Sequence, residues 1–124
     1  MTLNELSVVL NNWYEQGEDW NGFSPNKTET CMLLPCPSEQ VIERALIWFG
    51  KLPKPDRIIR LAAGGVGMVF NCPRYDIDIE FMGDKIVYPK PMIRMLVVNL
   101  SDGYTQAFNE SEIDSVFDKY YYAP

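Results

Sequence analysis

The sequence contains no histidine, and this absence removes several kinds of chemistry. Nucleophilic catalysis in which a histidine acts as the base is excluded. A structural zinc site needs about four ligands, and three cysteines without histidine do not favour one within a single chain. We therefore expect no bound metal and no cofactor. Cys31, Cys36 and Cys72 are expected to be free thiols, as is usual in reducing compartments.

Long apolar runs are also missing from the sequence. None approaches the roughly 20 residues that a membrane-spanning helix requires. The segment from Met1 to Glu5 has neither the basic start nor the apolar stretch of a secretory signal. The expectation is a cytoplasmic protein that does not bind a membrane.

An excess of basic residues is the third feature that the sequence lacks. The 17 acidic residues outnumber the 11 basic ones, which gives a net charge of −6. Proteins that bind nucleic acid without a special motif are usually basic, so direct nucleic-acid binding is not expected. With 47% hydrophobic residues in 124, the chain is predicted to fold as a single domain spanning residues 1–124.

The strongest pattern in the chain is the alternation of apolar and acidic residues over 75–81. This period predicts a half-buried β-strand with two different faces. One face would carry Ile77, Ile79 and Phe81, and the other would carry Asp76, Asp78 and Glu80. A Gly-Asp turn at 82–85 and a return strand at 86–88 are predicted to follow.

The remaining elements are predicted from periodicity and capping residues. Helices are expected over 3–16, over 37–50 with Pro37 in the first position, and from about 109 to the carboxyl end. Strands are expected over 57–61, 66–70 and 92–100, with a hairpin turn at the glycines that begin at Gly64. The prediction is an α+β fold: two amino-terminal helices and a carboxyl-terminal helix packed on one antiparallel sheet of four to five strands.

Residues 17–35 follow neither a helical nor a strand period, and they include the aromatic residues Trp20 and Phe23. Long loops of this kind often carry function. Aromatic residues in a loop can equally anchor it to the core. Both interpretations stay open.

Three interpretations apply to the row Asp76, Asp78 and Glu80. The carboxylates could bind a divalent cation and support hydrolysis, because oxygen ligands suit magnesium and calcium. They could instead be no more than the solvent-exposed face of an antiparallel sheet. A third possibility is a recognition row for a basic partner, flanked by the aromatic anchors Tyr75, Tyr88 and Tyr104.

Several motifs between residues 19 and 88 resemble a group of small uncharacterised bacterial and mobile-element proteins. These are a Trp-Asp-Gly-type loop (here Asp19-Trp20-Asn21-Gly22), a helix that ends in Leu52-Pro53, a glycine-marked hairpin, and the strand Asp78-Ile79-Glu80-Phe81 followed by Tyr88. The resemblance implies an α+β domain. It implies no activity and no catalytic residues.

The predicted function is a small, acidic, non-enzymatic inhibitor or adaptor that binds another protein with a basic surface. Size and charge are typical of antitoxins, immunity proteins and phage anti-defence proteins such as anti-CRISPR proteins. The expected partner-binding residues are Asp76, Asp78, Glu80, Trp20, Phe23, Tyr88 and Tyr104. A monomer or small homo-oligomer is expected. The alternatives are a metal-dependent hydrolase that uses the carboxylate row and a structural subunit that self-associates through an edge strand.

Overall fold

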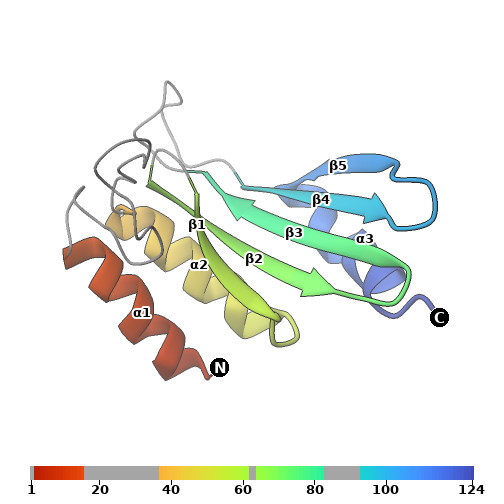
Figure 1. Ribbon diagram of the computed structural model, residues 1–124. Helices are drawn as coiled ribbons and strands as arrows, with labels where there is room; N and C mark the ends of the chain where they lie inside the picture. The colour runs from red at the N-terminus through yellow and green to blue at the C-terminus, as the bar shows by residue number, and fades with distance from the viewer. Residues whose placement is uncertain (1, 16–36, 62–63, 83–92) are drawn as a thin grey trace, which may run out of the picture.

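The computed structural model describes residues 2–15, 37–61, 64–82 and 93–124, and within them it shows an α+β fold (Figure 1). The helices are α1 (Leu3–Glu15), α2 (Glu39–Lys51) and α3 (Glu110–Tyr121), and the strands are β1 (Arg57–Leu61), β2 (Gly65–Asn71), β3 (Tyr75–Phe81), β4 (Ile93–Asn99) and β5 (Thr105–Asn109). This arrangement confirms the predicted fold class. None of the described helices is long and apolar enough to cross a membrane.

The five strands form one sheet in the order β1-β2-β3-β4-β5, and every neighbouring pair is antiparallel. The predicted β1–β2 hairpin is present, and Gly64 has a φ of 78°, a backbone conformation that favours glycine. The central strand β3 pairs with β2 on one side and with β4 on the other. The return strand predicted at 86–88 lies outside the described residues, and β4 is the strand that pairs with β3 on that side.

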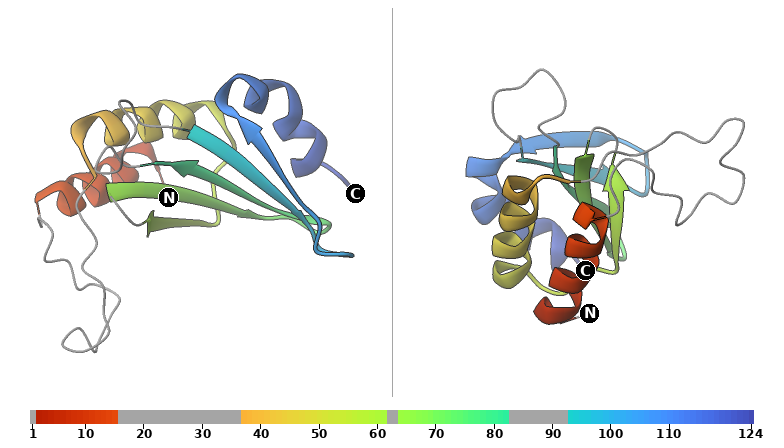
Figure 2. Two further views of the ribbon diagram at one scale, coloured as in Figure 1. Left: turned by 90° about the horizontal axis from the view of Figure 1, so that it is seen from above. Right: turned by 90° about the vertical axis from the view of Figure 1, so that its left-hand side faces the viewer.

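All three helices lie on the same side of the sheet (Figure 2). Helix α2 packs against β2 and β3, α3 packs against β3, β4 and β5, and α1 packs mainly against α2. Between the helices and the strands lies one apolar core, whose largest fully buried side chains are Phe70, Phe81, Phe117, Leu6, Leu10, Met68, Ile77, Ile79 and Met95.

The two amino-terminal helices begin at capping residues. Before α1, the Thr2 hydroxyl accepts a hydrogen bond from the Glu5 amide at 3.1 Å, and the Glu5 carboxylate accepts one from the Thr2 amide at 3.2 Å. This is the predicted capping box. Helix α2 begins two residues later than predicted, because Ser38 is its cap and its hydroxyl accepts from the Val41 amide. Pro37 therefore precedes the cap.

Helix α2 is tied to the start of α3 through Trp48. The helical spacing of apolar residues in the sequence places Phe49 at the centre of the buried face of this helix and Trp48 at its edge. The structure shows instead that both side chains are buried, with exposed fractions of 8% for Phe49 and 4% for Trp48. The indole Nε1–H of Trp48 donates to the Glu110 carboxylate at 3.3 Å, and the Arg44 guanidinium also contacts this carboxylate. Trp48 is thus a core residue with a satisfied polar atom.

Strand β5 is the one described strand that the sequence does not predict. Four of its five residues are exposed, because it is an edge strand with a single partner, β4. Helix α3 follows β5 without a loop. The Glu112 carboxylate accepts a hydrogen bond from the Asn109 amide at 3.1 Å, so the predicted cap at this helix start is present.

Candidate functional site

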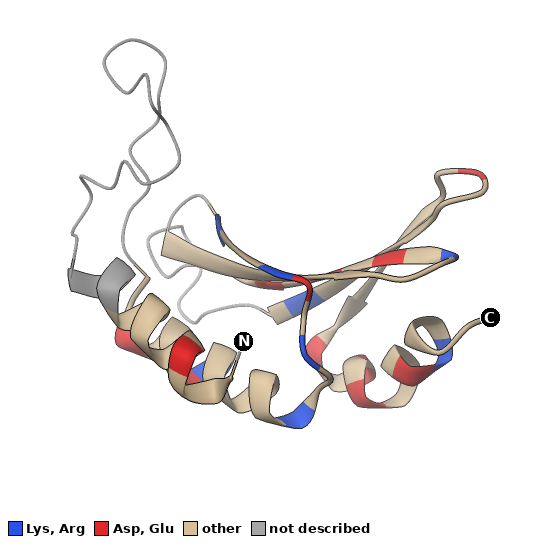
Figure 3. Ribbon diagram, turned by 60° about the horizontal axis from the view of Figure 1, so that its bottom comes forward, with Lys and Arg blue, Asp and Glu red and all other residues tan. Residues whose placement is uncertain are grey.

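One face of the sheet has none of the described helices packed on it, and we call it the open face (Figures 2 and 3). Strand pairing places opposed residues on the same face, so the register defines its members. They are Arg57, Ile59, Leu61, Gly65, Gly67, Val69, Asn71, Asp76, Asp78, Glu80, Arg94, Leu96, Val98, Thr105, Ala107 and Asn109. The predicted carboxylate row is at its centre, on β3.

The three carboxylates of the row have different surroundings. Glu80 lies opposite Arg94 on β4, and the Arg94 Nε–H donates to the Glu80 Oε1 at 2.6 Å. Neither Asp76 nor Asp78 forms a hydrogen bond or ion pair through its side chain with any described residue. Within the described part of the chain, two of the three predicted acids thus have no partner, whereas the third is already paired.

Asp78 is the middle carboxylate of the row, and its surroundings disfavour its charge. Its pKa is raised above the ordinary value, first by burial and then by the negative charges of Glu80 and Asp76, while Arg57 lowers it. The ionised form of Asp78 is therefore less favourable here than in water. A positive group placed against this carboxylate would remove part of that penalty.

Apolar side chains lie on the open face on both sides of Asp78. In the register, Asp78 is opposite Val69 on β2 and opposite Leu96 on β4. Val69 is only 6% exposed, although it does not belong to the core between sheet and helices. Towards β1, the Ile59 side chain lies over Gly67, where an added Cβ would be 2.9 Å from its Cγ1. The open face is thus a mixed apolar and acidic surface.

The other predicted binding residues do not join this row. Tyr75 and Tyr104 belong to the opposite face of the sheet, because Tyr75 pairs with Asn99 and the Asn99 amide donates to the Tyr104 carbonyl. The expected flanking of the carboxylates by these two tyrosines is therefore not observed. Trp20, Phe23 and Tyr88 lie outside the described residues.

The aliphatic residues of the open face and its two arginines, Arg57 and Arg94, are not predicted as site residues from the sequence. Leu96 and Val98 fall in a continuous apolar run, in which no alternation marks the residues that face away from the core. Arg94 is visible in the sequence, but its pairing with Glu80 depends on the strand register. Only the acidic side of the face carries a clear sequence signal.

The described residues of this face are suited to non-covalent binding. The described residues contain no group of three or more side chains placed to hold a metal ion. Cys72, the one cysteine in the described ranges, has a pKa raised by burial and then by the charges of Asp56 and Asp76, which reduces its thiolate fraction. Carboxylates beside aliphatic side chains can form ion pairs and apolar contacts with another macromolecule.

Comparison of the chain with protein-family models, with curated proteins and with solved structures found no match. A function can therefore be argued only from the geometry of the open face and from the chemistry of its residues.

Proposed function

We propose that the protein is a small, acidic, non-enzymatic inhibitor or adaptor, and that its open face binds a partner protein with a basic and partly apolar surface. The observation that carries this proposal is the pair Asp76 and Asp78, two carboxylates without a partner among the described residues, set between aliphatic side chains on the sheet face that none of the described helices covers. Lysine or arginine side chains of the partner would pair with them.

Charge complementarity supports the basic partner. Burial and two neighbouring acids disfavour the ionised form of Asp78, so an incoming cation stabilises the bound state more than it would at an isolated surface carboxylate. The net charge of −6 adds a long-range attraction that speeds the encounter with a basic protein and weakens as salt is added.

The aliphatic residues supply the part of the interface that does not depend on charge. Leu96 and Val98 are partly exposed on the open face, and Ile59 and Leu61 lie on the same face at the β1 edge. Burial of such side chains on association contributes roughly 25 cal/mol per Å² of apolar surface. The acids would then set orientation and the aliphatic residues would add affinity.

A binding experiment with matched charge variants tests the proposal. Proteins captured from a host lysate by the wild-type chain are identified, and the partner is purified for affinity measurements at several salt concentrations. The double variant Asp76→Asn/Asp78→Asn is compared with Glu43→Gln/Asp118→Asn, which changes the net charge equally at exposed helix positions. Glu80 is left intact because its loss would leave Arg94 unpaired.

The proposal predicts that the β3 variant binds the partner about tenfold more weakly, with a smaller salt dependence, as expected for the loss of two ion pairs at a partly buried surface. The helix variant should bind like wild type. Equal losses in both variants, or no loss in the β3 variant, would contradict the proposal. A wild-type homodimer that dissociates on the β3 substitutions would show self-association through the open face instead.

A further inference from the structure

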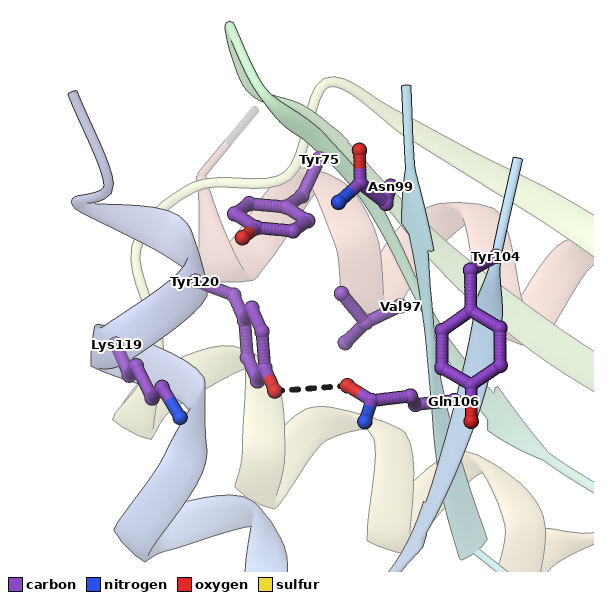
Figure 4. Close-up of a pocket in the computed structure, with 7 residues that line it drawn as sticks. All are labelled: Tyr75, Val97, Asn99, Tyr104, Gln106, Lys119 and Tyr120. Carbon is purple, nitrogen blue, oxygen red and sulfur yellow. Dashed lines mark hydrogen bonds between the residues drawn. The ribbon is translucent and has the colours of Figure 1, made fainter. Parts of the chain in front are cut away.

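On the helix side of the sheet, a cavity of about 260 Å³ lies between α3 and the strands β3, β4 and β5. Figure 4 shows Tyr75 and Tyr120 on one side of it and Tyr104 on the other, with Val97 between them. The Tyr75 and Tyr120 rings meet edge to face with centroids 5.0 Å apart. Tyr104 is 63% exposed, so one aromatic wall of the cavity is accessible from solvent.

Two side-chain amides in the cavity wall keep their donor groups available. The Gln106 Oε1 accepts a hydrogen bond from the Tyr120 hydroxyl at 2.8 Å, which leaves the Gln106 NH₂ group as a donor. The Asn99 Oδ1 accepts from the Ser101 amide at 2.8 Å, which leaves the Asn99 NH₂ group as a donor. Neither NH₂ group donates to another described residue.

The charge of this cavity is opposite to that of the chain as a whole. None of the described residues that line it is a carboxylate, although acidic residues outnumber basic ones in the sequence. Lys119 is the one charged residue among the described residues that line it. Its Nζ lies 5.3 Å from the centre of the Tyr120 ring, and it has no ion-pair partner in the same part of the chain. A second cation, Arg74, lies 5.9 Å from the Tyr75 ring.

We infer that this cavity binds a small planar ligand that carries a carboxylate, such as an aromatic monocarboxylate. The ring would lie against the tyrosines, and the carboxylate would accept a hydrogen bond from the Gln106 amide and pair with Lys119, at the end of the cavity where the Tyr120 hydroxyl lies (Figure 4). Lys119 disfavours a cationic ligand at the same place. The site is on the opposite face from the carboxylate row, so it is independent of the proposed protein-binding function.

The size of the cavity restricts the ligand to roughly one ring. A volume of about 260 Å³ is below the approximately 300–1,000 Å³ of sites that enclose drug-sized molecules. A single ring with a carboxylate fits this volume, whereas a nucleotide or a dinucleotide cofactor does not. For so few ligand atoms, a dissociation constant of about 1 mM is expected.

Benzoate is a suitable probe, and acetate and benzylamine are its controls. In an NMR titration of ¹⁵N-labelled protein, benzoate should cause saturable shifts of the side-chain amide signals of Asn99 and Gln106. Acetate lacks the ring and benzylamine reverses the charge, so both should bind at least several-fold more weakly. Absence of saturable shifts with millimolar benzoate, or equal binding of benzylamine, would overturn the inference.

Charge variants then test the role of Lys119. Lys119→Gln should weaken benzoate binding about fivefold, the effect of losing a solvent-exposed ion pair, and Lys119→Arg should retain most of the affinity. Lys54→Gln is the matched control, because Lys54 is also exposed but does not line the cavity. Equal affinities in the Lys119→Gln and wild-type proteins would refute the assignment of Lys119.

Discussion

The two faces of the sheet are built by the same strands under different constraints. On the face that the helices cover, β3 presents Ile77, Ile79 and Phe81, and all three are fully buried. On the open face the same strand presents Asp76, Asp78 and Glu80, which are partly exposed. On β3, therefore, the covered face carries only apolar residues over 77–81, whereas the open face carries charged residues beside the aliphatic residues of its neighbouring strands.

Because of this difference, we expect the side chains of the covered face to determine the stability of the fold and those of the open face to determine binding. Side chains between sheet and helices are removed from water on folding, and they supply most of the hydrophobic free energy. The open-face side chains of β1, β3 and β4 remain partly hydrated, so they contribute less to folding and can be used in binding. Substitutions on the two faces should therefore change different measured quantities.

The largest effect is expected at Trp48, on the covered side. Trp48→Ala should lower the free energy of unfolding by about 3–5 kcal/mol, and Phe49→Ala should cost a similar amount, because both side chains are buried. Chemical denaturation of the two variants checks this. A loss below about 1 kcal/mol for Trp48→Ala alone would show that Trp48 is not part of the core.

A neighbouring pair on β4 compares the faces directly. Met95 is fully buried on the covered face and Leu96 is partly exposed on the open face. Met95→Ala should lower the free energy of unfolding by about 2–5 kcal/mol, and Leu96→Ala by about 1 kcal/mol or less. If the order of the two losses were reversed in urea denaturation, the assignment of the faces would be wrong.

The close approach of Ile59 to Gly67 predicts an intermediate effect within the open face. Gly67→Ala should destabilise the fold by about 1–3 kcal/mol, because the new Cβ would overlap the Ile59 side chain. In the Ile59→Ala background the same substitution should cost clearly less. A double-mutant cycle measures this coupling, and additive losses would show that the two residues are not in contact.

How far the sequence predicts the molecule depends on the strength of each local signal. Helix α2 and strand β3 are predicted because their apolar residues recur at one clear period. Strand β5 is missed because an exposed edge strand needs no apolar alternation. The acids of the candidate site are predicted by alternation, but the pairing of Glu80 with Arg94 depends on register, which no local pattern specifies.

The residues that line the cavity beside α3 are even harder to predict from the sequence. Its residues come from β3, β4, β5, the turn before β5 and α3, and only the tertiary fold brings them together. Tyr104 is singled out by the sequence as an aromatic anchor, yet its actual neighbours are Gln106 and Asn99 rather than the carboxylate row. Sequence spacing provides no signal for that grouping.

The smallest expected effect on stability is at Asp78. Because its pKa is raised in the folded state, ionised Asp78 destabilises the fold above that pKa, and the penalty vanishes below the ordinary aspartate range near pH 4. Asp78→Asn should therefore raise the melting temperature slightly at pH 7, by a free energy within about 0.5 kcal/mol. The gain should disappear on acidification to about pH 3. A variant less stable than wild type at pH 7 would contradict this.

Hydroxyl-radical footprinting of the partner complex tests the central claim most directly. The rate of side-chain modification is measured at Leu96 and Val98 on the open face, and at Val8 and Ile47, which are exposed on α1 and α2. Binding through the open face predicts protection of Leu96 and Val98 in the complex, with unchanged rates at Val8 and Ile47. Protection of the two helix residues, with Leu96 and Val98 still fully reactive, would contradict it.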